Sequence, residues 1–219
     1  LTRGPDPHDA AREVEFGTDD PPRRVRQVLV EVARDLPLVS PDREPRAAAL
    51  GNSRYRIAIP LQKPGDREAV LDAFSTRLWY AARRAELHLD RDATDDWRTE
   101  ANLLAALRNT APLLHLRPAD AESLGPGARL ERYCAGESLL RPGIVPDGTR
   151  FILDGRVTLG IESETAGLVV IARLGADDAV GLTALTRSVT ISRAFASSDV
   201  DVIFIPVQLL DEVVRTHPA

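Results

Sequence analysis

Residues 129–159 have the sequence RLERYCAGESLLRPGIVPDGTRFILDGRVTL, which combines turn signals with an alternating pair of strands. Asp154-Gly155 separates the apolar run 151–153 from residues 156–159, and Asp-Gly between such runs is the strongest short-range signal for a β-hairpin. Further chain reversals are indicated upstream, at Gly136-Glu137, Pro142-Gly143 and Pro146-Asp147-Gly148. The stretch therefore predicts a compact β-roll.

The composition is that of an ordinary globular protein. At 219 residues and 23.9 kDa the chain suits two domains of about 100 residues each. No apolar run approaches the roughly 18 residues of a membrane-spanning helix, and no signal peptide pattern is present. The single cysteine, Cys134, cannot form an internal disulfide, which favours a reducing cytosolic setting. Because the sequence starts at Leu1 and lacks methionine, we expect it to be a soluble piece of a larger protein.

Charge and motif content exclude several functions. The net charge of −5 argues against a general nucleic-acid binder, which needs a clustered basic surface. The four histidines are scattered without metal-ligand spacing, so we expect no metal site. Nucleophile elbows and glycine-rich phosphate loops are also absent, so we expect no enzyme and no catalytic residues. Cys134 is interpreted as a small core residue within a strand.

The first part of the chain predicts a small α+β unit that closes by about residue 90. The expected elements are a strand at 12–16, a helix that starts at Asp19-Asp20-Pro21-Pro22 and ends at Pro37, a hairpin of 46–50 with 54–60, and a helix after Pro64-Gly65-Asp66. Acidic residues at the cap and proline in the first turn are typical helix starts, so Asp19-Asp20 and Asp66 are expected to cap the two helices. Both helices carry an apolar stripe at helical spacing. An acidic linker at residues 90–96 marks the domain boundary.

The second part is dense in strand signals. Helices are expected at 97–109 and from Pro118, strands at 168–174 and 199–206, and a final helix at 207–217. Short strands with helices before and after them predict a jelly-roll-like barrel bracketed by helices.

The first part resembles a known family in three segments: EVEFGTDDPPRRVRQVLVEVARDLPLV at 13–39, RAAALGNSRYRIAIPL at 46–61 and AVLDAFSTRLWYAARRAEL at 69–87. They resemble the C-terminal α/β domain of small-conductance mechanosensitive (MscS-like) ion channels. The resemblance implies a homo-oligomer, a heptamer in the full-length channel. It also implies a position on the cytoplasmic side of the plasma (inner) membrane, joined to it by a segment that this chain lacks. The family's proline-rich closing stretch is replaced here by LHLDRDATDDW at 87–97.

The second part resembles a cyclic nucleotide-binding domain. The signatures are Gly136-Glu137, Gly143 and the hairpin pattern Ile-x-x-Gly-x-Val at 152–157. These residues can be framework whether or not a ligand binds. The predicted fold class is thus α+β. It comprises a small α/β sandwich domain of the MscS C-terminal type at 11–91 and a β-roll (jelly-roll) cyclic-nucleotide-binding-like domain at 95–219, flanked by helices.

The resemblance also implies a ligand site, the phosphate-binding cassette, which corresponds here to VGLTALTRSVTISRAFAS at 180–197. In the family a helix N-terminus and an arginine hold the cyclic phosphate, and a glutamate holds the ribose 2′-hydroxyl. Here Leu182 replaces the glutamate, and the arginine position falls on Thr190 or Ile191. Arg187 and Arg193 remain open as displaced phosphate contacts. The candidate cassette residues are Val180, Gly181, Leu182, Thr183, Ala184, Thr190, Ile191, Ser192 and Arg193.

The leading hypothesis is therefore the cytosolic regulatory region of an MscS-like channel with a cyclic nucleotide-sensing domain. The ligand would be cAMP or cGMP, with no resident cofactor. If the altered cassette does not bind, the domain would serve as an assembly or docking module. The alternative is a soluble cyclic-nucleotide-binding signalling regulator without a channel.

Overall fold

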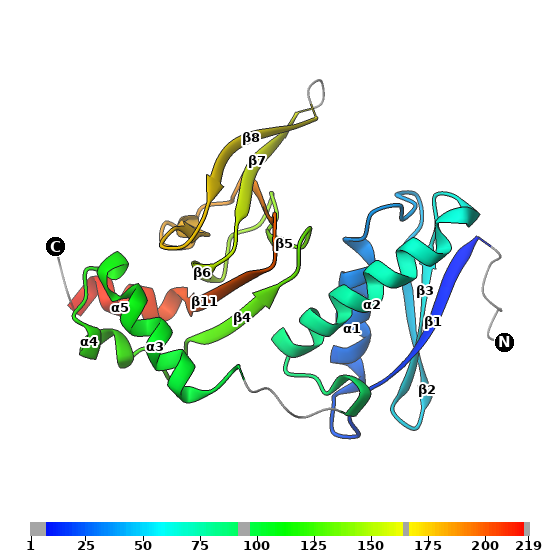
Figure 1. Cartoon of the computed structure of the whole chain (residues 1–219), viewed down its shortest axis with the longest axis horizontal. Coiled ribbons are helices and arrows are strands. Elements are labelled where there is room, and N and C mark those ends of the chain that lie inside the picture. Colours follow the sequence, from blue (N-terminus) through cyan, green and yellow to red (C-terminus); the bar gives the residue numbers. More distant parts are fainter. Residues whose placement is uncertain (1–7, 92–96, 164–166, 217–219) are drawn as a thin grey trace. The chain divides into compact units, whose positions relative to one another are not determined.

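The computed structural model describes residues 8–91, 97–163 and 167–216 and divides the chain into two compact units, residues 1–94 and 95–219 (Figure 1). Each unit is built around hydrophobic clusters of its own. Most of the acidic linker predicted at 90–96 lies outside the described residues. No helix in the described part of the chain is both long and apolar enough to span a bilayer.

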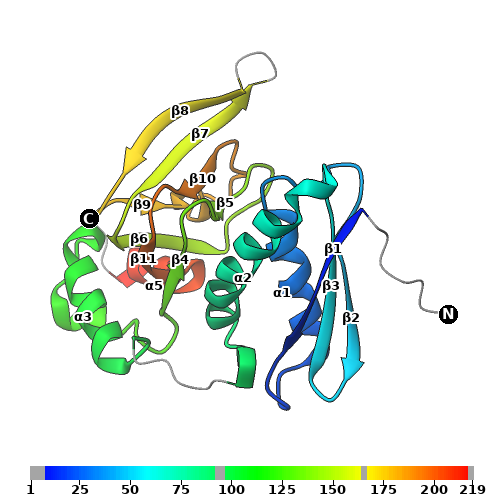
Figure 2. The same cartoon turned by 45° about the vertical axis from the view of Figure 1, so that its right-hand side comes forward.

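The first unit is a three-stranded antiparallel sheet with two helices on one face (Figures 1 and 2). Its main elements are β1 (Asp9–Glu15), α1 (Pro22–Arg34), β2 (Arg46–Gly51), β3 (Arg54–Pro60) and α2 (Arg67–Arg84). Two single-turn 3-10 helices, Pro64–Asp66 and Leu89–Arg91, flank α2. Strand β3 lies between β1 and β2. This is the element order that the sequence predicts.

Alternation along β3 decides which face of the sheet packs against the helices. Tyr55, Ile57 and Ile59 are buried, whereas Arg54 and Arg56 are exposed, as a period of two predicts. The predicted apolar stripes of the helices pack against this face. Their buried residues are Val25, Val28, Leu29, Val32 and Leu36 in the first and Val70, Phe74, Leu78 and Ala81 in the second, whereas Leu71 is only partly buried. The first unit therefore has the core that the sequence pattern indicates.

The prediction that acidic side chains cap α1 and α2 is wrong. Helix α1 follows Pro21, and neither Pro21 nor Asp66 before α2 makes a side-chain cap hydrogen bond. The buried carboxylate of Asp20 instead accepts hydrogen bonds from the backbone nitrogens of Gly17 at 2.9 Å and His88 at 2.8 Å. Its other oxygen lies 2.8 Å from Nδ1 of His88. Asp20 thus ties the turn after β1 to the segment after α2.

The second unit contains two four-stranded antiparallel sheets, with strand orders β5-β10-β7-β8 and β4-β11-β6-β9. The strands are β4 (Arg129–Tyr133), β5 (Ser138–Leu140), β6 (Gly148–Asp154), β7 (Val157–Ser163), β8 (Gly167–Leu174), β9 (Ala179–Val180), β10 (Arg193–Ala196) and β11 (Val200–Pro206). The helices are α3 (Glu100–Thr110), α4 (Pro118–Glu122) and α5 (Val207–Thr216), with a 3-10 turn at Ala111–Leu114. The predicted barrel bracketed by helices is confirmed.

The sheet β4-β11-β6-β9 has apolar residues on both faces. In β11, Val202 packs between the two sheets of the roll, whereas Ile203 and Ile205 pack against the cluster that includes helices α3, α4 and α5. Helix α3 starts at Glu100 rather than at Trp97 as predicted, because the Thr99 side chain accepts a hydrogen bond from the backbone nitrogen of Asn102 and caps it. Both faces of this sheet are therefore buried, one inside the roll and one under the helices.

The predicted turn between β6 and β7 is confirmed, and it requires glycine. Gly155 has a φ of 90°, and a Cβ atom there would lie 2.1 Å from the carbonyl oxygen of Asp199. The Gly136-Glu137 signature is also structural, because the buried Glu137 carboxylate accepts a hydrogen bond from the backbone nitrogen of Cys134 at 2.7 Å. Cys134 is a buried residue as predicted, but it follows β4 rather than lying within it. These residues shape the roll.

Candidate ligand-binding site

The cassette begins where β9 ends. Val180 is buried in the roll, and Gly181 starts a 3-10 turn at Leu182–Ala184. Gly181 has a φ of 89°, and a Cβ atom there would lie 2.8 Å from the carbonyl oxygen of Gly148. The hydroxyl of Thr149 on β6 donates to the Gly181 carbonyl at 3.4 Å. The start of the cassette is therefore fixed to β6, and only glycine fits there.

The two positions that would recognise a nucleotide carry apolar or neutral side chains. Leu182 is 54% exposed and Ile191 is 73% exposed, whereas Thr190 is only 3% exposed. The backbone of Thr190 is held by two hydrogen bonds to the preceding loop, from its nitrogen to the Ile144 carbonyl at 2.9 Å and from the Gly143 nitrogen to its carbonyl at 2.8 Å. The cassette thus keeps a defined backbone but offers no carboxylate or guanidinium at these positions.

The two arginines near the cassette are engaged elsewhere. Arg187 pairs with Asp211 on α5, and Nη1 of Arg193 lies 3.3 Å from Oε1 of Glu162 on β7. Hydroxyl groups are the remaining polar side chains: Thr190 Oγ1 lies 3.2 Å from Ser192 Oγ. Thr183 Oγ1 is buried and makes no hydrogen bond within the described residues. The predicted cassette residues therefore form a mostly neutral surface, in which Val180 and Ala184 belong to the core.

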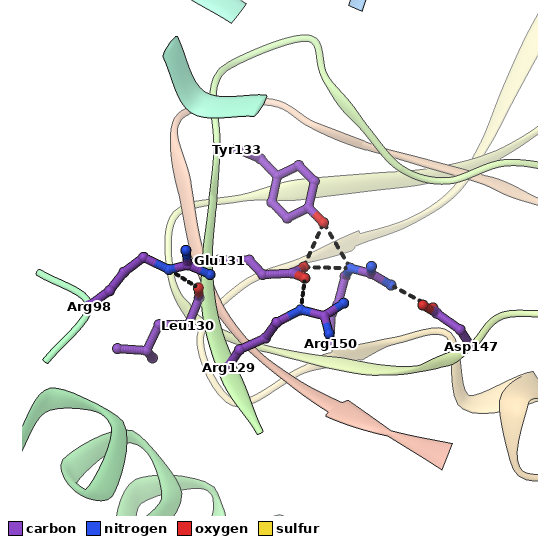
Figure 3. A network of polar contacts seen from close by, with 7 residues as sticks. All are labelled: Arg98, Arg129, Leu130, Glu131, Tyr133, Asp147 and Arg150. Carbon is purple, nitrogen blue, oxygen red and sulfur yellow. Dashed lines mark hydrogen bonds and ion pairs between the residues drawn. The ribbon is translucent and has the colours of Figure 1, made fainter. Parts of the chain in front are cut away.

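A charged network lies on strands β4 and β6 (Figure 3). Its residues on β4 are Arg129, Glu131 and Tyr133, which alternate along the strand and so share one face. Glu131 Oε1 accepts from Arg129 Nε at 2.9 Å, and its Oε2 accepts from Arg150 Nε at 3.0 Å. The hydroxyl of Tyr133 donates to the same Oε2 at 2.7 Å and accepts from Arg150 Nε at 2.9 Å. One carboxylate thus joins β4 to β6 across β11.

Burial and charge act in opposite directions in this network. The side chains of Glu131 and Arg150 are only 4% and 13% exposed. Burial alone would raise the pKa of Glu131, but Arg150, Tyr133 and Arg129 outweigh it and hold that pKa below its ordinary value of 4.5. Burial alone would lower the pKa of Arg150, but Tyr133, Glu131 and Asp147 raise it above the ordinary value. Both side chains are therefore charged at neutral pH.

Comparison with known proteins identifies the second unit. Residues 130–217 match the family model described as the cyclic nucleotide-binding domain. The second unit contains a cyclic nucleotide-binding domain. No curated protein matches the chain.

Several solved structures are similar to parts of the chain at low sequence identity. A cyclic nucleotide-binding-like protein from Brucella abortus is 25% identical over 51% of this chain and 97% of its own, with a TM-score of 0.43. The regulatory subunit of a cAMP-independent protein kinase A from Trypanosoma brucei is 13% identical over 75% of this chain, with a TM-score of 0.48. A structure from Ruegeria pomeroyi is 22% identical over 53% of this chain, with a TM-score of 0.47. The chain spans about half the length of the last two, 52% of each.

Sequence reasoning predicted a cassette at residues 180–197, which stays a prediction, and missed the Glu131 network. The available signal was the alternating string Arg129-Leu130-Glu131-Arg132-Tyr133, which places three polar side chains on one face of a strand. The network also needs Arg150, which lies near Glu131 only because β4 and β6 both pair with β11. That pairing is not visible in the local sequence.

Replacing Glu131 by glutamine is expected to destabilise the second unit by about 3 kcal/mol at pH 7, because two partly buried cations lose their shared anion. The depressed pKa of Glu131 means that its stabilising effect is present above about pH 4.5 and is lost as the pH falls through the lower folded-state value. The difference between wild type and Glu131→Gln should therefore shrink on acidification below pH 4.5. Urea unfolding followed through Trp97, in a Trp79→Phe background, measures it.

The matched control is Glu162→Gln. Glu162 is also a strand residue that pairs with an arginine, but its side chain is 61% exposed, so the loss should stay within about 1 kcal/mol. Equal losses of unfolding free energy in the two variants at pH 7 would contradict the assigned role of Glu131. So would a difference between wild type and Glu131→Gln that stays the same below pH 4.5.

Proposed function

We propose that the chain is a regulatory region in which the cyclic nucleotide-binding domain keeps its ligand-site framework but binds cAMP and cGMP much more weakly than a complete cassette would. The observation that carries this proposal is the cassette itself. Gly181 and the turn after it hold the expected backbone, while the solvent-facing positions are Leu182 and Ile191. Both positions therefore face solvent but lack the charges that would recognise ribose and phosphate.

The size of the effect follows from the missing contacts. Hydrogen bonds to charged groups contribute roughly 1.5–3 kcal/mol each. Losing one carboxylate contact and one guanidinium contact would remove roughly 3–6 kcal/mol, which corresponds to about two to four orders of magnitude in affinity. Backbone nitrogens at the 3-10 turn and the buried Thr183 hydroxyl would supply the remaining polar contacts.

In this proposal, the protein that is regulated is an MscS-like membrane channel. Support comes from the first unit, whose order β1-α1-β2-β3-α2 and whose segments 13–39, 46–61 and 69–87 resemble the cytoplasmic α/β domain of that family. The full-length channel would be a heptamer, and this chain would lie on the cytoplasmic side of the plasma (inner) membrane. The channel's open and closed states would be biased by whatever binds the second unit with different affinity in the two states. If nothing binds the cassette, the second unit would act in assembly.

A soluble signalling regulator without a channel is the second candidate. It is favoured by the family match, which covers residues 130–217 and leaves the first unit without an assignment. A regulator of this kind would use the same cassette, so both candidates have the same ligand chemistry. They differ in whether the first unit belongs to a membrane channel.

Calorimetric titration with cAMP and cGMP tests the ligand part of the proposal. The wild-type chain should bind both nucleotides with millimolar affinity or not at all. The double variant Leu182→Glu/Ile191→Arg, at two exposed positions, should bind cAMP at least about a hundredfold more tightly, since it restores both charged contacts.

Leu185→Glu with Val189→Arg serves as the matched control, because both residues are exposed cassette residues outside the two ligating positions. It should leave the affinity unchanged. Micromolar binding by the wild type, or equal gains in both double variants, would contradict the proposal.

The channel part is tested with the complete gene product. Expressed with an affinity tag, it should sediment with membranes and, after detergent extraction, show a heptameric mass in native mass spectrometry. Recovery in the supernatant after high-speed centrifugation would overturn the channel assignment in favour of the soluble regulator.

A further inference from the structure

The Glu131 network carries more positive than negative charge. Arg129 and Arg150 converge on a single buried carboxylate, and each contributes only its Nε (Figure 3). The other acidic neighbour is Asp147, whose Oδ1 lies 3.8 Å from Nη1 of Arg150 and whose side chain is 72% exposed. An ion pair with a solvent-exposed carboxylate is weak, so Asp147 offsets the charge of Arg150 less than the buried Glu131 does. The pair therefore keeps an excess of positive charge.

The terminal nitrogens of both arginines remain available. Within the described part of the chain, Nη1 and Nη2 of Arg129 make no hydrogen bond, and those of Arg150 have only the long ion pair with Asp147. Arg129 is 41% exposed, so this side of the network opens to solvent. Each guanidinium can thus still donate two parallel N–H groups, the geometry that matches a phosphate or carboxylate.

Stacking holds both guanidinium groups in place. The Cζ atoms of Arg129 and Arg150 lie 4.2 Å and 4.6 Å from the centre of the Phe204 ring on β11. In the sheet register, Phe204 lies opposite Arg129 on β4 and opposite Arg150 on β6. With Nε fixed by Glu131 and the planar group fixed by the ring, little rotamer freedom is left to lose when a ligand binds.

The pair also lies close to the start of the cassette. Arg150 is directly opposite Val180 in the pairing of β6 with β9. The preceding residue on β6, Thr149, donates a hydrogen bond to the carbonyl of Gly181. The cassette's own arginines are paired with Asp211 and Glu162. Each of those two pairs uses one terminal nitrogen and an exposed carboxylate. Arg129 and Arg150 differ from them because a buried carboxylate and the Phe204 ring hold both guanidinium groups in one orientation.

We propose that Arg129 and Arg150, stacked on Phe204 and oriented by Glu131, form an anion site that binds a phosphate group. The bound group is either free inorganic phosphate or the phosphate of a nucleotide. The inference goes beyond the proposed function, because the site exists whether or not the cassette accepts a cyclic nucleotide.

The experiment is an NMR titration of the full chain, labelled with 15N, in which the Nε–H signals of Arg129 and Arg150 are followed. Inorganic phosphate should give saturable shifts that sodium chloride at equal ionic strength does not reproduce. Arg129→Gln should weaken phosphate binding at least about tenfold, and Arg129→Lys, which keeps the charge but loses the fork, should lie between Arg129→Gln and wild type.

The matched control is Arg132→Gln. Arg132 lies on the same strand with similar exposure, pairs with Asp201 and stacks on Trp97, but it is not part of the network. It should leave phosphate affinity within about twofold of wild type. A site with no saturable response to phosphate, or an equal loss in Arg129→Gln and Arg132→Gln, would overturn the proposal.

A second titration with 5′-AMP separates the two sources of phosphate. Tighter binding of 5′-AMP than of inorganic phosphate, lost in Arg129→Gln, supports the site with a nucleotide as its ligand. Equal affinity for both, again lost in Arg129→Gln, supports it with free phosphate. If Arg129→Gln changes amide signals beyond residues near position 129, its fold is disturbed and the Arg129→Lys titration decides instead. Phosphate affinity equal to that of wild type in Arg129→Lys would contradict binding through the guanidinium group.

Discussion

The second unit depends on one buried carboxylate. Glu131 accepts hydrogen bonds from two arginines and a tyrosine that belong to β4 and β6, the two strands on either side of β11. A charge so deeply buried is tolerated only when it is paired and fully hydrogen-bonded. The carboxylate therefore fixes how these strands sit, and through β6 and β9 it fixes where the cassette begins.

Framework and ligand chemistry are separate in this domain. Glycines at positions 155 and 181 have positive φ and no room for a side chain, and Glu137 closes its own turn. These features hold the roll whatever the ligand is. The resemblance to cyclic nucleotide-binding domains implies a carboxylate at position 182 and an arginine at 190 or 191, where this chain has Leu182, Thr190 and Ile191. A family match alone therefore describes the fold of such a domain better than its ligand.

Much of the architecture could be predicted because it is encoded locally. The Asp154-Gly155 turn, the alternation along β3 and the apolar stripes of α1 and α2 each follow from the spacing of neighbouring residues. The turn at Gly181 after a short strand also follows from the local sequence, whereas its role as a ligand cassette stays a prediction. What could not be predicted depends on segments far apart in the sequence. The partner of Asp20 is His88, that of Glu131 is Arg150, and those of Arg187 and Arg193 are Asp211 and Glu162. Local patterns showed that these residues were polar, but only the fold shows which of them meet.

The central claim is the proposal that the domain keeps the roll while its cassette recognises cAMP and cGMP only weakly. Amide hydrogen exchange of the wild-type chain, measured with and without micromolar cAMP, tests it most directly, because protection reports each segment separately. The account predicts slow exchange in β4, β6 and β11 under both conditions and no change at residues 180–193. Protection of residues 180–193 on addition of cAMP would contradict it.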